Sequence, residues 1–306
     1  MKKCIIIMNP ESGKVKSLST KNEFYDVLRK HGYDAEIKYT KGPKDASRIV
    51  EELEDDVDLV ISAGGDGTLN EVVTGNLRRE KKLVLANLPM GTTNDVANMY
   101  GYTKDYQKNL ELLLNGVRKK VDVCYIDNTP FVYVACLGDY IDMAYNTPRN
   151  LKKKYGKIAY ILYGLRQLQN KIHKYHVKYK VDGVEHEGEY SFFFITNSSR
   201  VAGVDDIYYD VKMDDNMFEV ALANPKTKPD ILRMLVQVTM KDVKEVPGIT
   251  YYQTNDFEIE FLDKPKTSWC IDGEEYETSK AKYEFKVDQK VKMLIPRTNA
   301  KKLFNK

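Results

Sequence analysis

The sequence has little of what marks secreted or membrane-spanning proteins. Its four cysteines lie far apart in 306 residues and form no CxxC pair and no cluster with histidine. They are Cys4, Cys124, Cys136 and Cys270. No apolar run approaches the roughly 20 residues of a membrane-spanning helix, and the first run, residues 4–8, is too short for a signal-peptide core. We therefore expect a cytoplasmic protein with buried thiols, whose contact with a membrane would be peripheral.

The sequence also lacks an excess of charge of one sign. Lysine and arginine total 48 against 45 acidic residues, which gives a formal net charge of +3. This balance provides no overall attraction to nucleic acid, so we expect no nucleic-acid partner. The four histidines show no spacing typical of a metal site, and the chain has no internal repeat. A chain of 306 residues is long enough for two domains.

The first 125 or so residues alternate short apolar strands with amphipathic helices. Strands are expected over residues 4–8, 34–39, 58–63 and 83–88, and helices over 22–30 and 45–54. This alternation is typical of a doubly wound α/β sheet.

After about residue 121, apolar and polar residues alternate instead. Turn signals stand at Asp182-Gly183 and Asp272-Gly273, and together these features indicate an antiparallel β domain. Strands are expected over residues 177–181, 190–196, 218–223, 257–262 and 283–287.

A glycine-rich segment directly follows the strand over 58–63. It consists of Gly64, Gly65, Asp66, Gly67, Thr68, Leu69, Asn70 and Glu71. Glycines at a strand-to-helix turn let the backbone approach a phosphate, and the amides of the helix N-terminus donate to it. A carboxylate at Asp66 fits such a site if a cation lies between it and the phosphates, which indicates Mg²⁺ carried in with ATP. The alternative is a tight turn in which Thr68 and Glu71 form a capping box.

Two further polar loops follow predicted strands. One consists of Pro89, Met90, Gly91, Thr92, Thr93, Asn94 and Asp95. The hydroxyls of Thr92 and Thr93 can hold phosphate oxygens. Asn94 and Asp95 can cap a helix or bind ribose and metal-bound water. The alternative is an ordinary polar loop. The other consists of Asn9, Pro10, Glu11, Ser12, Gly13 and Lys14. Because loops after parallel strands gather at the carboxyl ends of the sheet, three of them on one edge indicate a nucleotide site.

With these three segments and a late Asp272-Gly273-Glu274, the chain resembles the diacylglycerol kinase catalytic-domain family, specifically the soluble bacterial diacylglycerol kinases and related lipid kinases. The four segments follow the family's order over nearly the whole chain. The resemblance implies an α/β ATP-binding domain over residues 1–124, completed by a terminal strand near 291–306. It also implies a β-sandwich lipid-acceptor domain over 125–290, with the active site in the cleft between the domains.

The resemblance also implies roles for individual residues. It gives ATP contacts at Asn9, Pro10, Glu11, Ser12, Gly13, Thr40, Gly65, Asp66, Gly67, Thr68, Leu69, Asn70, Glu71 and Thr92. Asp66 would engage Mg-ATP, and Glu274 would be the proton acceptor, with Asp272 close by. A carboxylate suits that task, because an alcohol attacks phosphorus well only when a base takes its proton. The alternative for Asp272-Gly273-Glu274 is a plain hairpin turn.

A second Mg²⁺ site, with a structural role, is implied in the second domain. Its ligands would be the Asp215 side chain and the backbone carbonyls of Lys212 and Met217. Asn216 stands where the family has glycine, and asparagine tolerates the positive φ that this turn needs. The alternative is an acidic surface turn.

A helix expected over residues 151–175 has one apolar face and several lysines elsewhere. Such a helix can lie on an anionic bilayer, or it can cover one end of the β-sandwich.

The leading hypothesis is a lipid kinase that transfers the γ-phosphate of ATP to a lipid hydroxyl, with diacylglycerol as the first candidate and phosphatidic acid as its product. One alternative is a nucleotide kinase similar to NAD kinases. The loop from Pro89 to Asp95 argues against it, because this loop fits the lipid-kinase pattern. Another alternative is a lipid-binding regulator without activity. The presence of both Asp66 and Glu274 argues against it. The sequence leaves the acceptor lipid and the oligomeric state open, a homodimer included.

Overall fold

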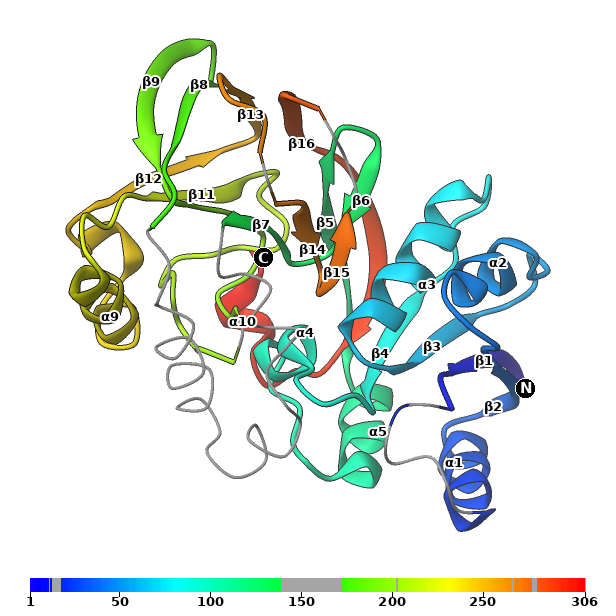
Figure 1. The fold of residues 1–306 in the computed structure, drawn as a ribbon. Helices are drawn as coiled ribbons and strands as arrows, with labels where there is room; N and C mark the ends of the chain where they lie inside the picture. Colours follow the sequence, from blue (N-terminus) through cyan, green and yellow to red (C-terminus); the bar gives the residue numbers. More distant parts are fainter. Residues whose placement is uncertain are drawn as a thin grey trace. The chain divides into compact units, whose positions relative to one another are not determined.

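The computed structural model describes residues 1–10, 12, 18–138, 172–201, 203–265, 267–276 and 280–305 (Figure 1). The chain divides into two compact units, neither of them continuous in sequence. Unit 1 comprises Met1–Val123, Lys212–Asp215 and Gln289–Lys306, and unit 2 comprises Cys124–Val211 and Asn216–Asp288. No helix in the described part of the chain is long and apolar enough to cross a membrane.

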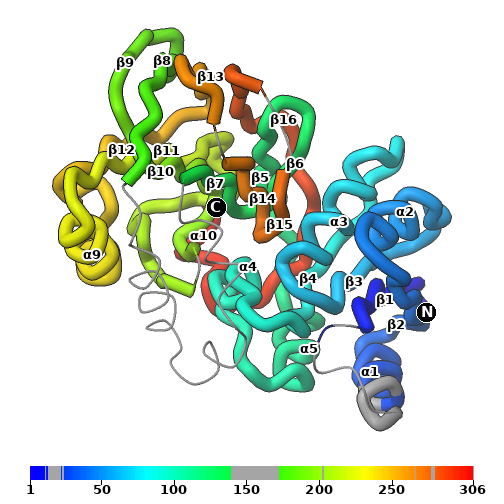
Figure 2. Tube along the Cα trace, in the orientation of Figure 1, coloured from blue at the N-terminus to red at the C-terminus, as the bar shows by residue number. Residues whose placement is uncertain are grey.

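Unit 1 is built on a parallel sheet. Its strands are ordered β2 (Tyr33–Tyr39), β1 (Lys2–Met8), β3 (Leu59–Gly64), β4 (Leu85–Pro89) and the end of β16 (Lys282–Ile295). Figure 2 follows the chain through the first of these strands in blue and cyan. β16 joins the sheet by pairing Met293 and Leu294 with Leu85 and Ala86 of β4. Strand order and connections are those of a doubly wound α/β sheet, as predicted.

Six helices of unit 1 lie in the described part of the chain: α1 (Leu18–Lys30), α2 (Asp45–Glu51), α3 (Asp66–Arg78), α4 (Asp95–Met99), α5 (Tyr106–Leu114) and α10 (Ala300–Leu303). β3 and β4 are buried at every residue, because helices cover both faces of a doubly wound sheet. That burial explains why both strands are continuous apolar runs in the sequence.

Unit 2 consists of antiparallel strands in two groups. The first is ordered β12 (Ile249–Thr254), β11 (Phe218–Ala223), β10 (Phe192–Thr196), β7 (Val134–Gly138), β14 (Trp269–Ile271) and β15 (Glu274–Tyr276). The second is ordered β16, β13 (Asp256–Phe261), β8 (Tyr175–Val181) and β9 (Val184–Tyr190). β5 (Val117–Ile126) and β6 (Thr129–Phe131) pair with each other, and β5 also pairs with β16. The predicted antiparallel β domain is thereby confirmed.

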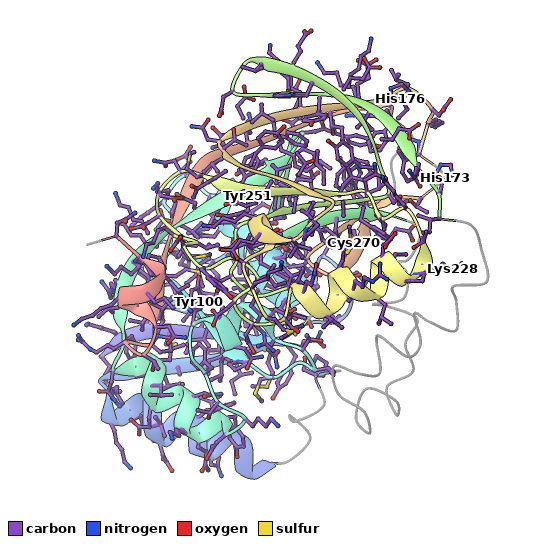
Figure 3. The ribbon with its side chains drawn as sticks, turned by 90° about the vertical axis from the view of Figure 1, so that its left-hand side faces the viewer. Tyr100, His173, His176, Lys228, Tyr251 and Cys270 are labelled. Carbon is purple, nitrogen blue, oxygen red and sulfur yellow. The ribbon has the colours of Figure 1, made fainter. Side chains whose placement is uncertain are left out.

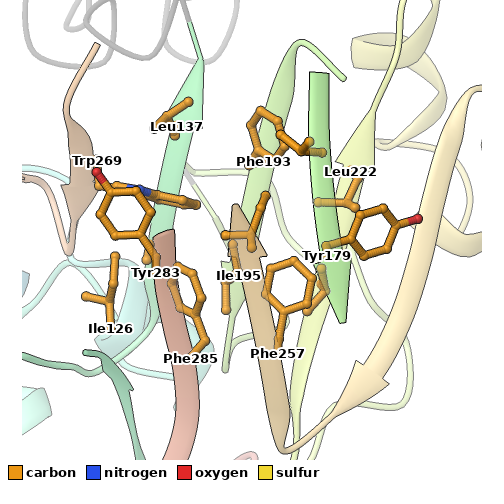
Figure 4. Packing of buried hydrophobic residues seen from close by; sticks show 14 of the residues in the cluster. Ile126, Leu137, Tyr179, Phe193, Ile195, Leu222, Phe257, Trp269, Tyr283 and Phe285 are labelled. Atoms are coloured by element: carbon orange, nitrogen blue, oxygen red, sulfur yellow. The ribbon is translucent and has the colours of Figure 1, made fainter. Parts of the chain in front are cut away.

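The core of unit 2 is a cluster of aromatic side chains between these two groups of strands (Figure 4). Trp269 on β14 meets Phe285 on β16 with ring centroids 5.1 Å apart. Phe193 on β10 meets Phe261 on β13 at 5.2 Å. Each such side chain, once fully buried, stabilises the fold by about 1.5–3 kcal/mol.

Both predicted hairpin turns are present. Asp182 and Gly183 have φ values of 49° and 84°, and Asp272 and Gly273 have values of 48° and 98°. Two consecutive residues with positive φ form the tight turn that best matches the twist of antiparallel strands.

Several predicted boundaries differ from the structure. The helix expected over residues 151–175 lies outside the described residues except at its end, where Tyr175 begins β8 instead. The strand expected over 190–196 is interrupted at Ser191, between β9 and β10. The sequence interpretation missed α9 (Lys228–Gln237) and a short 3₁₀ turn, η1 (Val243–Glu245), in unit 2.

The four cysteines are buried and free, as predicted. Burial raises the pKa of the Cys4 thiol to about 12. A hydrogen bond with Cys270, its neighbour across β7 and β14, and burial together raise the pKa of the Cys136 thiol. All four thiols therefore behave as small core side chains.

Candidate active site

The predicted loops of unit 1 meet at one edge of the sheet. The backbone N–H of Asn9, after β1, donates to Ala63 O at 3.2 Å, and that of Thr40, after β2, donates to Met8 O at 3.0 Å. Met90, after β4, donates to Gly64 O at 2.9 Å. All four strands are parallel, so their carboxyl ends bring these loops together.

The two glycine turns are in direct contact. The N–H of Gly91 donates to Gly64 O at 3.1 Å. A Cβ atom at Gly91 would stand 2.6 Å from Gly65 Cα, and one at Gly64 would stand 2.3 Å from Thr68 Oγ1. None of these glycines has a positive φ, so close approach of the backbones requires glycine here, rather than an unusual dihedral angle.

Asp66 links the turn after β3 to the turn after β4. Its carboxylate accepts hydrogen bonds from the N–H groups of Asp95 at 2.8 Å and Val96 at 3.2 Å, at the start of α4. The side chains of Asp66 and Asp95 are both buried, at 8% and 1% exposure. A buried carboxylate here is stabilised by the amides of a helix N-terminus.

Asn94 is the N-cap residue of α4, but its side chain closes its own loop. Its Oδ1 accepts from the N–H of Gly91 at 3.0 Å, and its Nδ2 donates to Gly91 O at 2.8 Å. The backbone of Asn94 is left-handed, with φ of 50°. The prediction that this side chain could cap the helix is therefore wrong, since no cap bond forms at α4.

The alternative interpretation of the glycine segment, a capping box of Thr68 and Glu71, is also wrong. α3 begins at Asp66, and Gly65 is its N-cap. Glu71 instead accepts from the N–H groups of Lys44 at 2.8 Å and Ala46 at 3.0 Å, at the start of α2. The remaining predicted residues of this segment, Gly67, Leu69 and Asn70, lie in the first turns of α3.

The first polar loop is only partly described. Ser12 is buried and its N–H donates to Asn9 O at 3.1 Å, while Glu11 and Gly13 lie outside the described residues. Thr40 is buried beside this loop, whereas Pro10 and Thr92 are exposed.

In unit 2, the carboxylate of Asp272 binds three backbone amides. Oδ2 accepts from Val132 at 2.6 Å, and Oδ1 accepts from Tyr133 and Val134, each at 3.0 Å. The backbone N–H of Asp272 donates to Val134 O at 2.9 Å. Asp272 thus fixes the turn that leads into Glu274, which is exposed at the start of β15.

The segment expected to bind a second metal crosses the boundary between the units, with Lys212 and Asp215 in unit 1 and Met217 in unit 2. Asn216 has φ of 59°, so asparagine does adopt the conformation for which glycine would be used. Within the described ranges, no group of three or more histidine, cysteine, aspartate or glutamate residues could hold a metal ion.

Sequence reasoning missed a hollow of about 420 Å³ in unit 1, lined by Lys82, Lys120, Lys290 and Lys292. Lys82 precedes β4, at the opposite end of the strand from the glycine turn. The hollow is therefore separate from the loops that meet at the carboxyl edge. Its lysines are scattered over three segments, and no sequence signal would have joined them.

Comparison with known proteins identifies the family. The profile of the diacylglycerol kinase catalytic domain matches residues 3–126, and that of the YegS C-terminal NAD kinase β-sandwich-like domain matches residues 141–291. A diacylglycerol kinase of Bacillus subtilis (strain 168) is 29% identical over 279 residues, covering 90% of each chain. One of Staphylococcus aureus (strain JH9) is 30% identical over 278 residues, covering 89% of this chain and 86% of the relative.

A solved structure of a diacylglycerol kinase from Bacillus anthracis (str. Sterne) shares the fold. It superposes with a TM-score of 0.78 at 23% identity, over 98% of this chain and 99% of that one. The likeness to this structure concerns the fold alone, while the two profiles and the bacterial relatives establish kinship. The chain belongs to the diacylglycerol kinase family and is a kinase.

Proposed function

We propose that this kinase phosphorylates the free hydroxyl of diacylglycerol with ATP and so forms phosphatidic acid. The observation that supports this most is the contact of the two glycine turns, where Gly91 N–H donates to Gly64 O and Asp66 accepts from Asp95 N–H. Relatives in two bacteria carry the name of this activity over most of the chain's length. A cytoplasmic location and a peripheral contact with the membrane belong to the same proposal.

The turns of unit 1 fit ATP with a divalent cation, which we take to be Mg²⁺. Glycine backbone without side chains leaves amides open to phosphate oxygens, and Asp66 offers the carboxylate oxygens that Mg²⁺ prefers. When bound, the cation would neutralise charge on the phosphoryl group that is transferred. The proposed ATP contacts are Asn9, Pro10, Glu11, Ser12, Gly13, Thr40, Gly64, Gly65, Asp66, Gly67, Thr68, Leu69, Asn70, Glu71, Thr92, Asn94 and Asp95.

In this proposal Glu274 takes the proton from the acceptor hydroxyl. An exposed carboxylate at the start of β15 is open to a substrate, unlike the buried Asp272. Asp272 contributes by holding the turn, because its oxygens are already engaged with three backbone N–H groups. A general base typically accelerates such a reaction by about 10²- to 10⁴-fold.

A structural Mg²⁺ held by Asp215 and the carbonyls of Lys212 and Met217 is a further part of the proposal. The left-handed backbone of Asn216 supports it, because it keeps the turn that such a site needs.

A phosphorylation assay tests the proposal. Purified protein is incubated with labelled ATP and either a panel of lipids or NAD, and the products are separated by chromatography. We expect labelled phosphatidic acid, lost in Asp66→Asn and reduced at least about 100-fold in Glu274→Gln. Glu275→Gln is the matched control, because Glu275 is exposed on the same strand.

Other outcomes would redirect the assignment. Labelled NADP would identify a nucleotide kinase, and phosphorylation of another lipid alcohol would change the acceptor. ATP consumption that never depends on a lipid would point to a regulator. Full activity of Glu274→Gln would remove this residue from the reaction.

A further inference from the structure

α9 lies at the outer edge of unit 2 and buries none of its 10 residues (Figure 1). Every other α-helix in the described part of the chain buries at least two residues, and even the short α10 buries Ala300 and Leu303. α9 is nevertheless well formed, because Thr227 and Asp230 make a capping box at its start, with Thr227 N–H donating to Asp230 Oδ2 at 2.8 Å. Packing against unit 2 therefore leaves part of its apolar surface exposed.

Three apolar side chains of α9 and of the turn after it are exposed. Leu235, Val236 and Met240 are 42%, 45% and 76% exposed. Leu235 and Val236 lie in the last turn of α9, and Met240 lies in the turn that follows it, so the three exposed side chains are close together along the chain. Met234 faces inward, since its Cε lies 2.5 Å from the place where Gly248 would carry a Cβ.

Basic residues share this segment of the chain with the apolar side chains. Residues 226–241 contain four basic residues and one acidic residue, a net charge of +3. Arg233 pairs with Asp230, the acidic one, at 3.1 Å. Lys226, Lys228 and Lys241 have no ion pair among the described residues, and Lys228 marks the start of the helix in Figure 3.

We propose that the α9 surface, residues 226–241, docks onto the face of a bilayer that contains anionic phospholipids. Protruding apolar side chains enter the boundary between headgroups and acyl chains, and the lysines meet the lipid phosphates. The surface would hold the enzyme at the membrane that contains its acceptor; in this respect the inference rests on the proposed function. Docking itself needs no turnover, so it can be measured separately.

A second copy of the chain fits this surface less well. In a symmetric dimer each α9 surface would face the other, and the lysines that have no ion pair within the described ranges would repel those of the second copy. An anionic bilayer supplies the opposite charge and an apolar layer together.

Vesicle sedimentation with the full chain tests the proposal. The probes are vesicles of phosphatidylcholine alone and vesicles in which part of it is replaced by phosphatidylglycerol. We expect binding to the anionic vesicles that weakens with salt, and a loss of about tenfold or more in affinity for Leu235→Ser combined with Met240→Ser. Lys226→Gln with Lys241→Gln should also weaken binding. Val184→Ser is the matched control, because Val184 is 59% exposed elsewhere in unit 2.

The activity of the same variants separates this inference from the proposed function. Phosphorylation of a short-chain diacylglycerol, dispersed as monomers, should be unchanged, while phosphorylation of diacylglycerol in anionic vesicles should show a raised apparent KM. If the unaltered chain phosphorylates no lipid, but the double variant binds vesicles more weakly than the unaltered chain, docking is sustained and the proposed lipid kinase activity is refuted. Unchanged vesicle binding in an active double variant would overturn docking. A dimer that dissociates in the double variant would overturn it too, and would assign the surface to a second copy.

Discussion

Single carboxylates of the candidate site perform two different tasks. Asp66, Glu71 and Asp272 each accept hydrogen bonds from backbone N–H groups of residues distant in sequence, up to 140 positions away for Asp272. Such a carboxylate fixes one loop against another, since charged hydrogen bonds are about twice as strong as neutral ones. Glu274 is exposed and differs from them in this respect. The exposed residue is thus the one to which we assign proton transfer.

Asp272→Asn should destabilise unit 2 and slow the reaction together. Asparagine keeps one acceptor oxygen but turns an NH₂ group toward a backbone N–H, which leaves a buried donor unsatisfied. We expect the free energy of unfolding to fall by about 2 kcal/mol and kcat to fall with KM for ATP unchanged. Urea unfolding and steady-state kinetics measure both, with Glu275→Gln as control. An Asp272→Asn protein of full stability and reduced kcat would instead place Asp272 in the chemistry.

Gly91→Ala should separate the two glycine turns. The new Cβ would stand 2.6 Å from Gly65 Cα, so one backbone must move. A misplacement of this size should lower kcat/KM for ATP by roughly 10- to 100-fold. Gly42→Ala is the control, because nothing lies within 4 Å of the Cβ position at Gly42. Equal loss in both variants would contradict the requirement for close approach.

Secondary structure elements differ in how well the sequence predicts them. The buried strands of unit 1 and the hairpins of unit 2 follow from apolar runs and from Asp-Gly pairs, which are local signals. α9 also had a local signal, Thr227 with Pro229 and Asp230, which marks a capped helix start, so its omission was avoidable.

Contacts between elements could not be predicted in this way. The alternative interpretation placed Glu71 in a capping box within its own helix, but α3 begins earlier, at Asp66, and Glu71 reaches α2. Nothing in the sequence near Glu71 names Lys44 or Ala46 as its partners. The same holds for Asp272, whose partners are backbone amides that any residue would supply.

Gly75→Ala should weaken the packing of α3 against α2. A Cβ at Gly75 would stand 2.2 Å from the backbone oxygen of Ser47, so the two helices must separate. Overpacking of this kind costs about 1–3 kcal/mol of unfolding free energy. Urea unfolding measures it, again with Gly42→Ala as the control. A stability equal to that of the control would show that the helices can shift without loss.

The whole molecule is two units between which the chain passes repeatedly. Residues 212–215 belong to unit 1 although they lie far along the chain, because Met213 N–H donates to Leu303 O and Met213 O accepts from Asp122 N–H. β16 begins in unit 2 and ends beside β4 of unit 1. No pattern in the sequence of 212–215 indicates this return, since it depends on partners in two distant segments.

Lys290 connects the three segments that complete unit 1. Lys290 lies on β16. Its Nζ is 2.8 Å from Asp122 Oδ1 on β5 and donates to Asp214 O at 2.9 Å. The side chain of Asp122 is fully buried and that of Lys290 is 29% exposed. Removal of the lysine would leave a buried carboxylate without its cation, which is costly for the fold.

Lys290→Ala should therefore destabilise unit 1 by about 2 kcal/mol, less than for a wholly buried pair because water reaches the lysine. Hydrogen exchange should rise in β1, β3 and β4 and stay low in β8 and β13. Lys292→Ala, on the same strand and exposed, is the matched control. Combining Asp122→Asn with Lys290→Gln should restore part of the loss, since no buried charge is then left alone. If Lys290→Ala and Lys292→Ala unfolded at the same urea concentration, the ion pair would not hold these segments together.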